Sequence, residues 1–120
     1  VAIDPAGNAW VSDVSNRRIQ VFAPDGALLR VIGGGTRPDR AMAPNQVAFD
    51  DVCLVFVASS DPAEVQVLTA AGALVGSWGN SGDVALANID RQPGALLGPK
   101  GIALDGRGNV YVSDNIIGRV

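Results

Sequence analysis

Short apolar stretches separated by turn residues run along the whole chain. Near the N-terminus, four such stretches cover residues 1–4, 9–13, 18–23 and 27–32, and Val, Ile, Phe and Trp dominate them. Pro and Gly between the stretches favour tight turns, and little of the pattern has a helical period. The stretch 54–58 is apolar at every position, as expected for a strand with both faces covered. The pattern predicts an all-β chain built from short antiparallel strands.

The same pattern returns twice further along the chain. Residues 1–4 (VAID) correspond to residues 47–50 (VAFD), at an offset of 46, and these correspond to residues 102–105 (IALD), at an offset of 55. The difference falls in one segment, residues 80–98, which we interpret as an insertion. Repeats of this length are typical of stacked structural units. We therefore expect part of one domain, made of a unit 1–46, a unit 47–101 with the insertion 80–98, and an incomplete unit 102–120.

Four strands in about 46 residues is the size of one β-propeller blade. The first unit resembles the NHL repeat through Ile3-Asp4-Pro5, Gly7-Asn8, Val11-Ser12-Asp13, residues 16–22, Asp25-Gly26 and Gly33. The third unit is similar through residues 109–114 and 119–120, and the middle unit keeps residues 65–68 and Gly72. The resemblance implies blades of four antiparallel strands and a segment of a six-bladed ring. It also implies a platform that binds proteins, RNA or ligands, or in some members an enzyme.

Composition narrows the classes of function. The chain carries a formal net charge of −3, whereas a general nucleic-acid binder normally has a basic excess. It contains no His and a single Cys, so the commonest metal ligand, a Cys pair and an internal disulfide are all excluded. No apolar run approaches the about 20 residues that span a bilayer. The excess of Arg over Lys and the many Ala favour a bacterial source, and we expect an extracytoplasmic location.

Two acid–base pairs recur at a spacing of five residues. Asp13 precedes Arg18, and Asp114 precedes Arg119, whereas the middle unit has Ser59 and Glu64 at the matching positions. Because acid and base are lost together, we predict that each aspartate holds its arginine across the loop between the second and third strands. This is a structural role.

One rim of the predicted propeller collects most of the cations. Its candidate binding residues, on loops between strands and in the insertion, are Arg17, Arg37, Arg40, Asp83, Asp90 and Arg91. One interpretation is a solvated rim, and the other is a docking surface for an acidic partner or an anionic ligand. The opposite rim carries five aspartates against two arginines.

Asp4, Asp50 and Asp105 occupy one equivalent position in the three units. Either they hold their own turns through side-chain to backbone hydrogen bonds, which we favour, or they form a carboxylate ring that binds Ca²⁺. In the middle unit, residues 51–54 (DVCL) lack the Pro/Gly-Asn signature, so this turn is expected to be lost. Cys53 is expected to be a partly buried, unreactive thiol.

The leading function is a non-enzymatic interaction module that binds a protein, peptide or glycan through rim loops and uses no cofactor. Resemblance to propeller enzymes implies an alternative, a segment of a metal-dependent, lactonase-like hydrolase or lyase with its site in further blades. Asn45, Asn88 and Asn115 would be its candidate ligands here.

An open stack of blades also leaves two sheet faces bare. If each face has about 400 Å² of surface, its exposure to water would cost about 10 kcal/mol of free energy. We therefore expect coverage by remaining blades of the same chain or by self-association.

Overall fold

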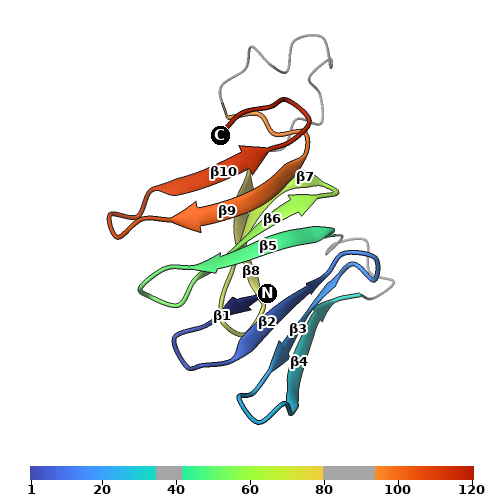
Figure 1. Ribbon diagram of the computed structural model, residues 1–120, viewed down its shortest axis with the longest axis vertical. Coiled ribbons are helices and arrows are strands. Elements are labelled where there is room, and N and C mark those ends of the chain that lie inside the picture. The colour runs from blue at the N-terminus through green and yellow to red at the C-terminus, as the bar shows by residue number, and fades with distance from the viewer. Residues whose placement is uncertain (35–41, 80–93) are drawn as a thin grey trace.

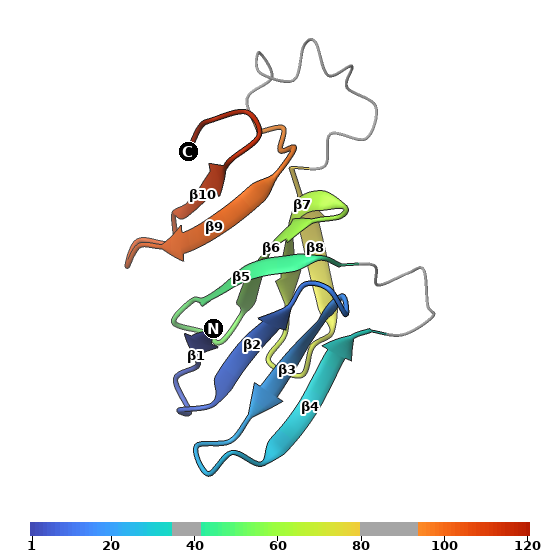
Figure 2. The same cartoon turned by 45° about the vertical axis from the view of Figure 1, so that its right-hand side comes forward.

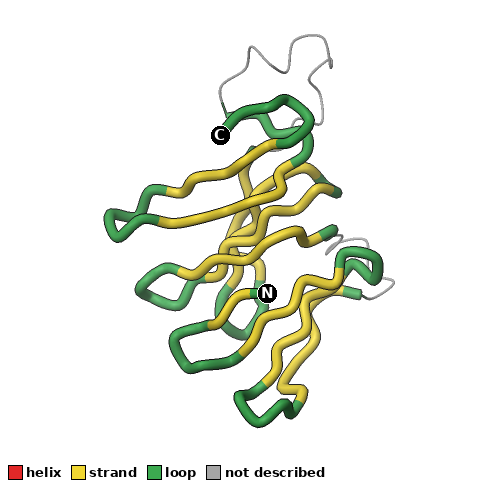
Figure 3. The backbone as a smooth tube through the Cα atoms, viewed as in Figure 1, coloured by secondary structure: helices red, strands yellow, loops and turns green. Residues whose placement is uncertain are grey.

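The computed structural model describes residues 1–34, 42–79 and 94–120. Within these ranges the chain forms ten strands and no helix, which Figure 3 shows as yellow strands joined by green turns. Consequently, nothing in the described part is a helix that could cross a membrane. The prediction of an all-β chain is confirmed.

The strands form three antiparallel sheets, which we name blades 1 to 3. Blade 1 has the order β1 (Ala2–Ile3), β2 (Ala9–Asp13), β3 (Arg18–Phe22), β4 (Leu28–Gly33). Blade 2 has the order β5 (Pro44–Phe49), β6 (Val55–Ser60), β7 (Ala63–Leu68), β8 (Leu74–Trp78). Blade 3 contains two strands, β9 (Pro99–Leu104) and β10 (Val110–Asp114).

The blades lie face to face in a row (Figures 1 and 2). The first strand of each blade lies at one edge of its sheet. These first strands are neighbours, since β5 contacts both β1 and β9, and we call them the inner strands. The turns between the first and second strands of all three blades lie on the same side, at the left of Figure 1. We name this side the turn rim and the side with the β2–β3 and β6–β7 loops the loop rim.

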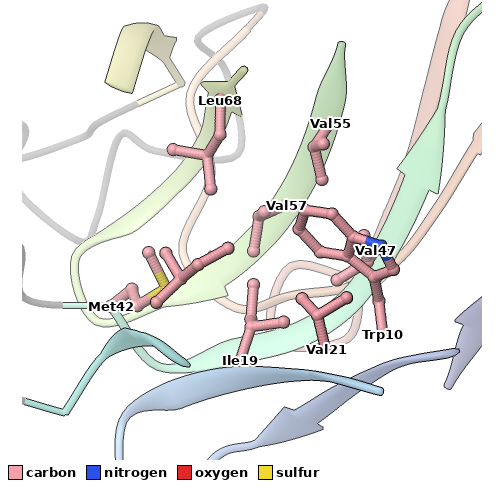
Figure 4. Close-up of a cluster of buried hydrophobic side chains, with 9 residues drawn as sticks. Trp10, Ile19, Val21, Met42, Val47, Val55, Val57 and Leu68 are labelled. Atoms are coloured by element: carbon pink, nitrogen blue, oxygen red, sulfur yellow. The ribbon is translucent and has the colours of Figure 1, made fainter. Parts of the chain in front are cut away.

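Alternation along each strand divides the apolar side chains between the two faces of a blade. Between blades 1 and 2, a cluster of buried side chains contains Trp10, Ile19, Val21, Ile32, Met42, Val47, Val55, Val57 and Leu68. Figure 4 shows these side chains converging from both blades. Trp10 and Phe49 pack edge to face with their ring centroids 5.4 Å apart. Between blades 2 and 3, a smaller cluster contains Ala58, Val65, Leu96, Ile102 and Val112.

The inner strands begin earlier than the repeat pattern predicts. The pattern begins at Val47 and Ile102, but the strands start at Pro44 and Pro99. Proline lacks the N–H that a ladder uses, yet it is tolerated as the first residue of a strand. Each proline is buried at the point where the chain enters the next blade.

The chain enters blades 2 and 3 through similar apolar contacts. A Cβ built on Gly33 would lie 3.5 Å from Met42, and one on Gly79 would lie 2.6 Å from Leu96. Both glycines have left-handed φ values, +82° and +89°. Leu96 belongs to the predicted insertion and packs onto the blade, while residues 80–93 lie outside the described residues.

Candidate functional site

The turns of the turn rim are built around an aspartate. In blade 1, the Asp4 carboxylate accepts hydrogen bonds from the Ala6 and Asn8 backbone N–H groups at 2.9 and 2.8 Å. It also accepts bonds from the Asn8 amide at 2.9 Å and from the Trp10 indole N–H at 3.0 Å. Burial raises the pKa of Asp4, but the bonds from Trp10, Asn8 and the backbone outweigh it and hold the pKa below its ordinary value.

Blade 3 repeats this turn on different residues. The Asp105 carboxylate accepts bonds from the Arg107 and Asn109 N–H groups, both at 2.9 Å. The Asn109 amide donates at 2.7 Å, and the Tyr111 hydroxyl, in the place of Trp10, donates at 3.2 Å. Chiefly through Asn109, these bonds lower the pKa of Asp105 to about 2. Each carboxylate therefore already accepts four hydrogen bonds, three from its own turn and one from the aromatic residue on the second strand of its blade.

The turn of blade 2 is retained, so the prediction that it is lost was wrong. Asp50 accepts hydrogen bonds from the Val52 and Leu54 N–H groups at 3.0 and 2.8 Å, as Asp4 and Asp105 do in their turns. Cys53 adopts the left-handed conformation (φ +65°) that Gly7 and Gly108 adopt in the other turns. The prediction of a partly buried thiol was also wrong, because Cys53 is exposed.

A groove lies between each pair of successive turns. The first groove has a volume of about 180 Å³ and is lined by the Asp4 turn, Trp10, Arg30, Phe49, Cys53 and Ala70. Its floor is apolar, and the guanidinium of Arg30 crosses to the carbonyl oxygen of Ala70 in the neighbouring blade.

The second groove has a volume of about 370 Å³ and repeats the first one blade later. It is lined by Phe49, the turn residues 50–52, Leu104, and the turn residues 105–108. Residues 50–52 correspond to residues 4–6, while Leu104 and Gly108 correspond to Phe49 and Cys53. Sequence reasoning missed both grooves because each wall comes from a different repeat unit.

On the loop rim, the structure brings Asp13 and Arg18 together. Arg18 Nε donates to Asp13 Oδ2 at 2.8 Å, and Asn16 Nδ2 donates to both carboxylate oxygens at 3.0 and 2.9 Å. The bonds from Asn16, followed by Arg18, lower the pKa of Asp13.

The Asp114 side chain also contacts the segment that enters blade 3. Its carboxylate accepts backbone hydrogen bonds from Leu97 and Gly98 at 2.7 and 3.0 Å, and from Ile116 and Ile117 at 3.0 and 3.2 Å. Burial raises the pKa of Asp114, but these bonds outweigh it and the pKa lies below its ordinary value.

Arg119 pairs with Asp114 through backbone hydrogen bonds, and its guanidinium donates to the carbonyl oxygen of Ala95. In blade 2, the Ser59 hydroxyl accepts from Ala43 N–H at 3.1 Å, as Asp114 accepts from Gly98. In blades 2 and 3 this position therefore holds the segment that enters the blade.

Of the six candidate binding residues, the structure describes Arg17. Arg17 forms an ion pair with Asp61, which joins the loop rims of blades 1 and 2. Its side chain remains 49% exposed. The other five candidates, Arg37, Arg40, Asp83, Asp90 and Arg91, lie outside the described residues, as does Asn88.

The inner strands place Asn45 and Lys100 beside each other. Asn45 Nδ2 donates to the Pro99 carbonyl at 2.7 Å, and Lys100 Nζ donates to Asn45 Oδ1 at 3.4 Å. Asn115 lies apart, at the end of β10, where its N–H donates to the Gly98 carbonyl at 3.1 Å. Across residues 1–34, 42–79 and 94–120, no three His, Cys, Asp or Glu side chains are grouped closely enough to hold a metal ion.

Comparisons with known proteins bear on the fold. No family model matches the sequence, and no curated protein matches it. A crystal structure of selenomethionine-substituted virginiamycin B lyase from Staphylococcus aureus is similar, with a TM-score of 0.69 and 16% sequence identity. The match covers 97% of this chain and 33% of the lyase chain, so the chain spans about a third of that protein's length. Because the lyase is a β-propeller, the similarity shows that this chain has the β-propeller fold.

Proposed function

We propose that this chain is part of an NHL-like β-propeller that acts as a non-enzymatic interaction module and binds a protein, peptide or glycan through its rim. Among these partners the described geometry favours a polypeptide. The observation that carries the proposal is the groove that repeats at equivalent residues between successive turns. A ligand that runs along the turn rim would meet the same kind of surface at each blade.

The chemistry of the grooves indicates the kind of partner. The floor of the first groove is apolar, with the Phe49 ring at the boundary between the two grooves. Asp51, at the second groove, is exposed, and the turn rim has more aspartates than arginines. A segment with apolar side chains flanked by cationic ones would complement this surface. The loop rim, with Arg17, is the alternative docking surface.

Filling each groove tests the proposal. Peptides are first selected from a displayed library on the intact chain, and their dissociation constants are then measured by calorimetry. Ala6→Trp fills the first groove and Val52→Trp fills the second; both positions are exposed. We expect either substitution to raise the dissociation constant about tenfold or more, since it removes an apolar contact.

Ser15→Trp is the matched control, because Ser15 is exposed on the loop rim. It should leave binding unchanged. If Ser15→Trp or Arg17→Glu abolishes binding while both groove variants bind normally, the ligand docks on the loop rim. Failure to select any peptide argues against a polypeptide ligand.

The similarity to a lyase structure favours a second candidate function. Under this second function, the chain is a segment of a metal-dependent propeller enzyme, either a lactonase-like hydrolase or a lyase. The site of that enzyme would lie mainly in further blades. Metal analysis of the intact protein separates the two candidates: a stoichiometric metal such as Ca²⁺ favours the enzyme, and its absence after dialysis against that metal favours the interaction module.

We also propose that another blade covers the outer face of blade 1. Ile3 is 60% exposed, whereas its counterpart Phe49 is half-buried against blade 1. Val1 is 82% exposed, whereas its counterpart Val47 is 4% exposed. The blade would come from the same polypeptide or from a second copy. Denatured and native masses of one sample distinguish them, and a stable folded monomer of 12.3 kDa contradicts the proposal.

A further inference from the structure

The first groove of the turn rim has an arginine on the outer strand of blade 1. Arg30 on β4 is the register partner of Val21 on β3, and both side chains line this groove. In blade 2 the corresponding pair is Gly76 and Val67, so the outer strand has no side chain at this position. All residues that line the first groove belong to blades 1 and 2, each of which has four strands. The walls of the first groove are therefore complete within the described residues.

The guanidinium of Arg30 has hydrogen-bond donors to spare. It donates to the carbonyl oxygen of Ala70, which holds it against the neighbouring blade. An arginine carries five N–H donors, so this bond leaves others for a ligand. Within the described residues the ion pairs are those of Arg17 and Arg18, and Arg30 has no carboxylate partner. The first groove therefore contains a positioned cation whose charge no carboxylate neutralises.

The Asp4 carboxylate also lines this groove, but its hydrogen bonds are taken by its own blade. It accepts from the Ala6 N–H, from the Asn8 N–H and amide, and from the Trp10 indole. β2 and β3 lie between β1, which Asp4 follows, and the strand that carries Arg30. Because neighbouring strands lie about 4.8 Å apart, Asp4 and Arg30 line opposite ends of the groove.

An apolar floor lies between these two ends. It is formed by the rings of Trp10 and Phe49, whose centroids are 5.4 Å apart, with Val21 and Val55 beside them. The volume of the groove is about 180 Å³. A cavity of about 150 Å³ holds a benzene ring, so this groove has room for one apolar side chain. The Arg30 guanidinium would then lie at the outer end of that side chain.

The last residue of a polypeptide carries both an apolar side chain and a carboxylate when its side chain is aliphatic or aromatic. We propose that the first groove binds the C-terminal residue of its polypeptide partner. The side chain lies on the floor of Trp10 and Phe49, and the α-carboxylate accepts hydrogen bonds from Arg30. The preceding residues cross Phe49 toward the second groove, where the exposed Asp51 favours a cationic side chain. This inference rests on the proposed function and names the part of the partner that enters the first groove.

Peptides that differ only in the C-terminal group test this inference on the intact chain. The first probe is the acetylated tetrapeptide Lys-Ala-Ala-Phe with a free carboxylate, and the second is the same peptide with a C-terminal amide. NMR titration of the Trp10 indole N–H, which lines the groove, gives both dissociation constants. We expect the amide to bind about fivefold more weakly or worse, because it lacks the charged acceptor for Arg30.

Substitution of the arginine should remove this preference. In Arg30→Gln the two peptides should have equal dissociation constants. Both are measured on the same variant, so a change in its stability affects them alike. Arg17→Gln is the matched control, because Arg17 is an exposed arginine on the loop rim, and it should keep the preference for the carboxylate.

A third peptide, acetylated Lys-Ala-Glu-Ala amide, carries its carboxylate on an internal side chain. If it binds as tightly as the free-carboxylate peptide, Arg30 recognises an acidic side chain and the inference is overturned. Equal binding of the first two peptides to the unchanged chain also overturns it, because Arg30 then only braces the two blades. The same holds if Arg30→Gln keeps the preference, or if neither of the first two peptides binds up to its solubility limit.

The groove-filling variant separates failure of this inference from failure of the proposed function. Ala6 lines the first groove. If the peptides selected from the displayed library lose affinity for Ala6→Trp but show no preference for a free carboxylate, the proposed function stands and this inference is overturned. If the selected peptides bind Ala6→Trp and Val52→Trp as they bind the unchanged chain, both are overturned.

Discussion

The two junctions between blades follow one plan but differ in how completely they are closed. Between blades 1 and 2, Ile19, Val21 and Ile32 from the outer half of blade 1 meet Leu68 from blade 2, and all four are nearly inaccessible to water. Between blades 2 and 3, the outer half of the contact is a hollow beside Trp78. In the junction between blades 1 and 2, Leu68 on the third strand of the following blade thus contributes to closing the contact.

Substitution of the aromatic residue on the second strand should give the largest change in the free energy of unfolding. Trp10 and Tyr111 are equivalent, and both donate a hydrogen bond to the aspartate of their turn. Trp10 is 2% exposed, whereas Tyr111 is 51% exposed. Trp10→Ala should lower the free energy of unfolding by about 3–5 kcal/mol, the usual loss for a buried Trp, and Tyr111→Ala by less than about 1 kcal/mol.

Urea unfolding followed by circular dichroism measures both variants. Equal losses would show that the face carrying Tyr111 is covered in solution. That result would support ring closure by another blade. It would also mean that Trp10 in blade 1 and Tyr111 in blade 3 are equally covered.

The residue that holds the entering segment gives the next largest effect. Asp114 accepts two hydrogen bonds from residues 97 and 98, and Ser59 accepts one from Ala43. Both side chains are buried, with exposed fractions of 2% and 0%. Removal of the acceptor leaves buried N–H groups unpaired. Asp114→Ala should therefore lower the free energy of unfolding by about 2 kcal/mol, and Ser59→Ala should lower it by about 1 kcal/mol.

Hydrogen exchange can locate this effect in the chain. We expect faster exchange at the Leu97 and Gly98 amides in Asp114→Ala, and at the Ala43 amide in Ser59→Ala. If exchange changes instead around Arg18 or Arg119, the position serves the arginine and the interpretation given by the five-residue spacing was correct.

Sequence reasoning predicted the strands and the fold because they depend on local alternation and on turn residues. The first unit shows this: its predicted stretch 9–13 coincides with β2. Sequence reasoning failed at contacts between two repeat units. The Asp13–Arg18 contact is local to one hairpin and could be read from the spacing, whereas the contacts of Asp114 reach back 16 and 17 residues to the entering segment.

The lost-turn prediction failed for another reason. It relied on the Pro/Gly-Asn signature, but the aspartate and one left-handed residue are sufficient to form the turn. Both remain in blade 2, as Asp50 and Cys53. Only the Asp at the equivalent position could have signalled this from the sequence.

Cys53 provides a smaller, stabilising comparison between the turns. A left-handed conformation costs a side-chain-bearing residue about 1–2 kcal/mol, and part of that is offset by the greater freedom of Gly in the unfolded chain. Cys53→Gly should therefore raise the free energy of unfolding by about 0.5–1 kcal/mol. The reverse change, Gly7→Cys, should lower it by a similar amount. A loss of stability in Cys53→Gly would mean that the thiol makes a contact worth more than the backbone strain.

The dependence of stability on pH gives the smallest expected effect and again compares the turns. The folded pKa of Asp105, about 2, lies below the ordinary value for aspartate. The resulting stabilisation is fully present above about pH 4 and is lost as the pH falls through about 2, because the unfolded chain takes up its proton first. Asn109 is the largest cause of the lowered pKa, and blade 2 has Leu54 in its place. Asn109→Leu should therefore raise the pKa of the Asp105 carboxyl, as followed by NMR titration, and flatten the fall of the urea midpoint between about pH 4 and pH 2. An unchanged Asp105 titration would mean that the backbone N–H groups of the turn alone stabilise the carboxylate.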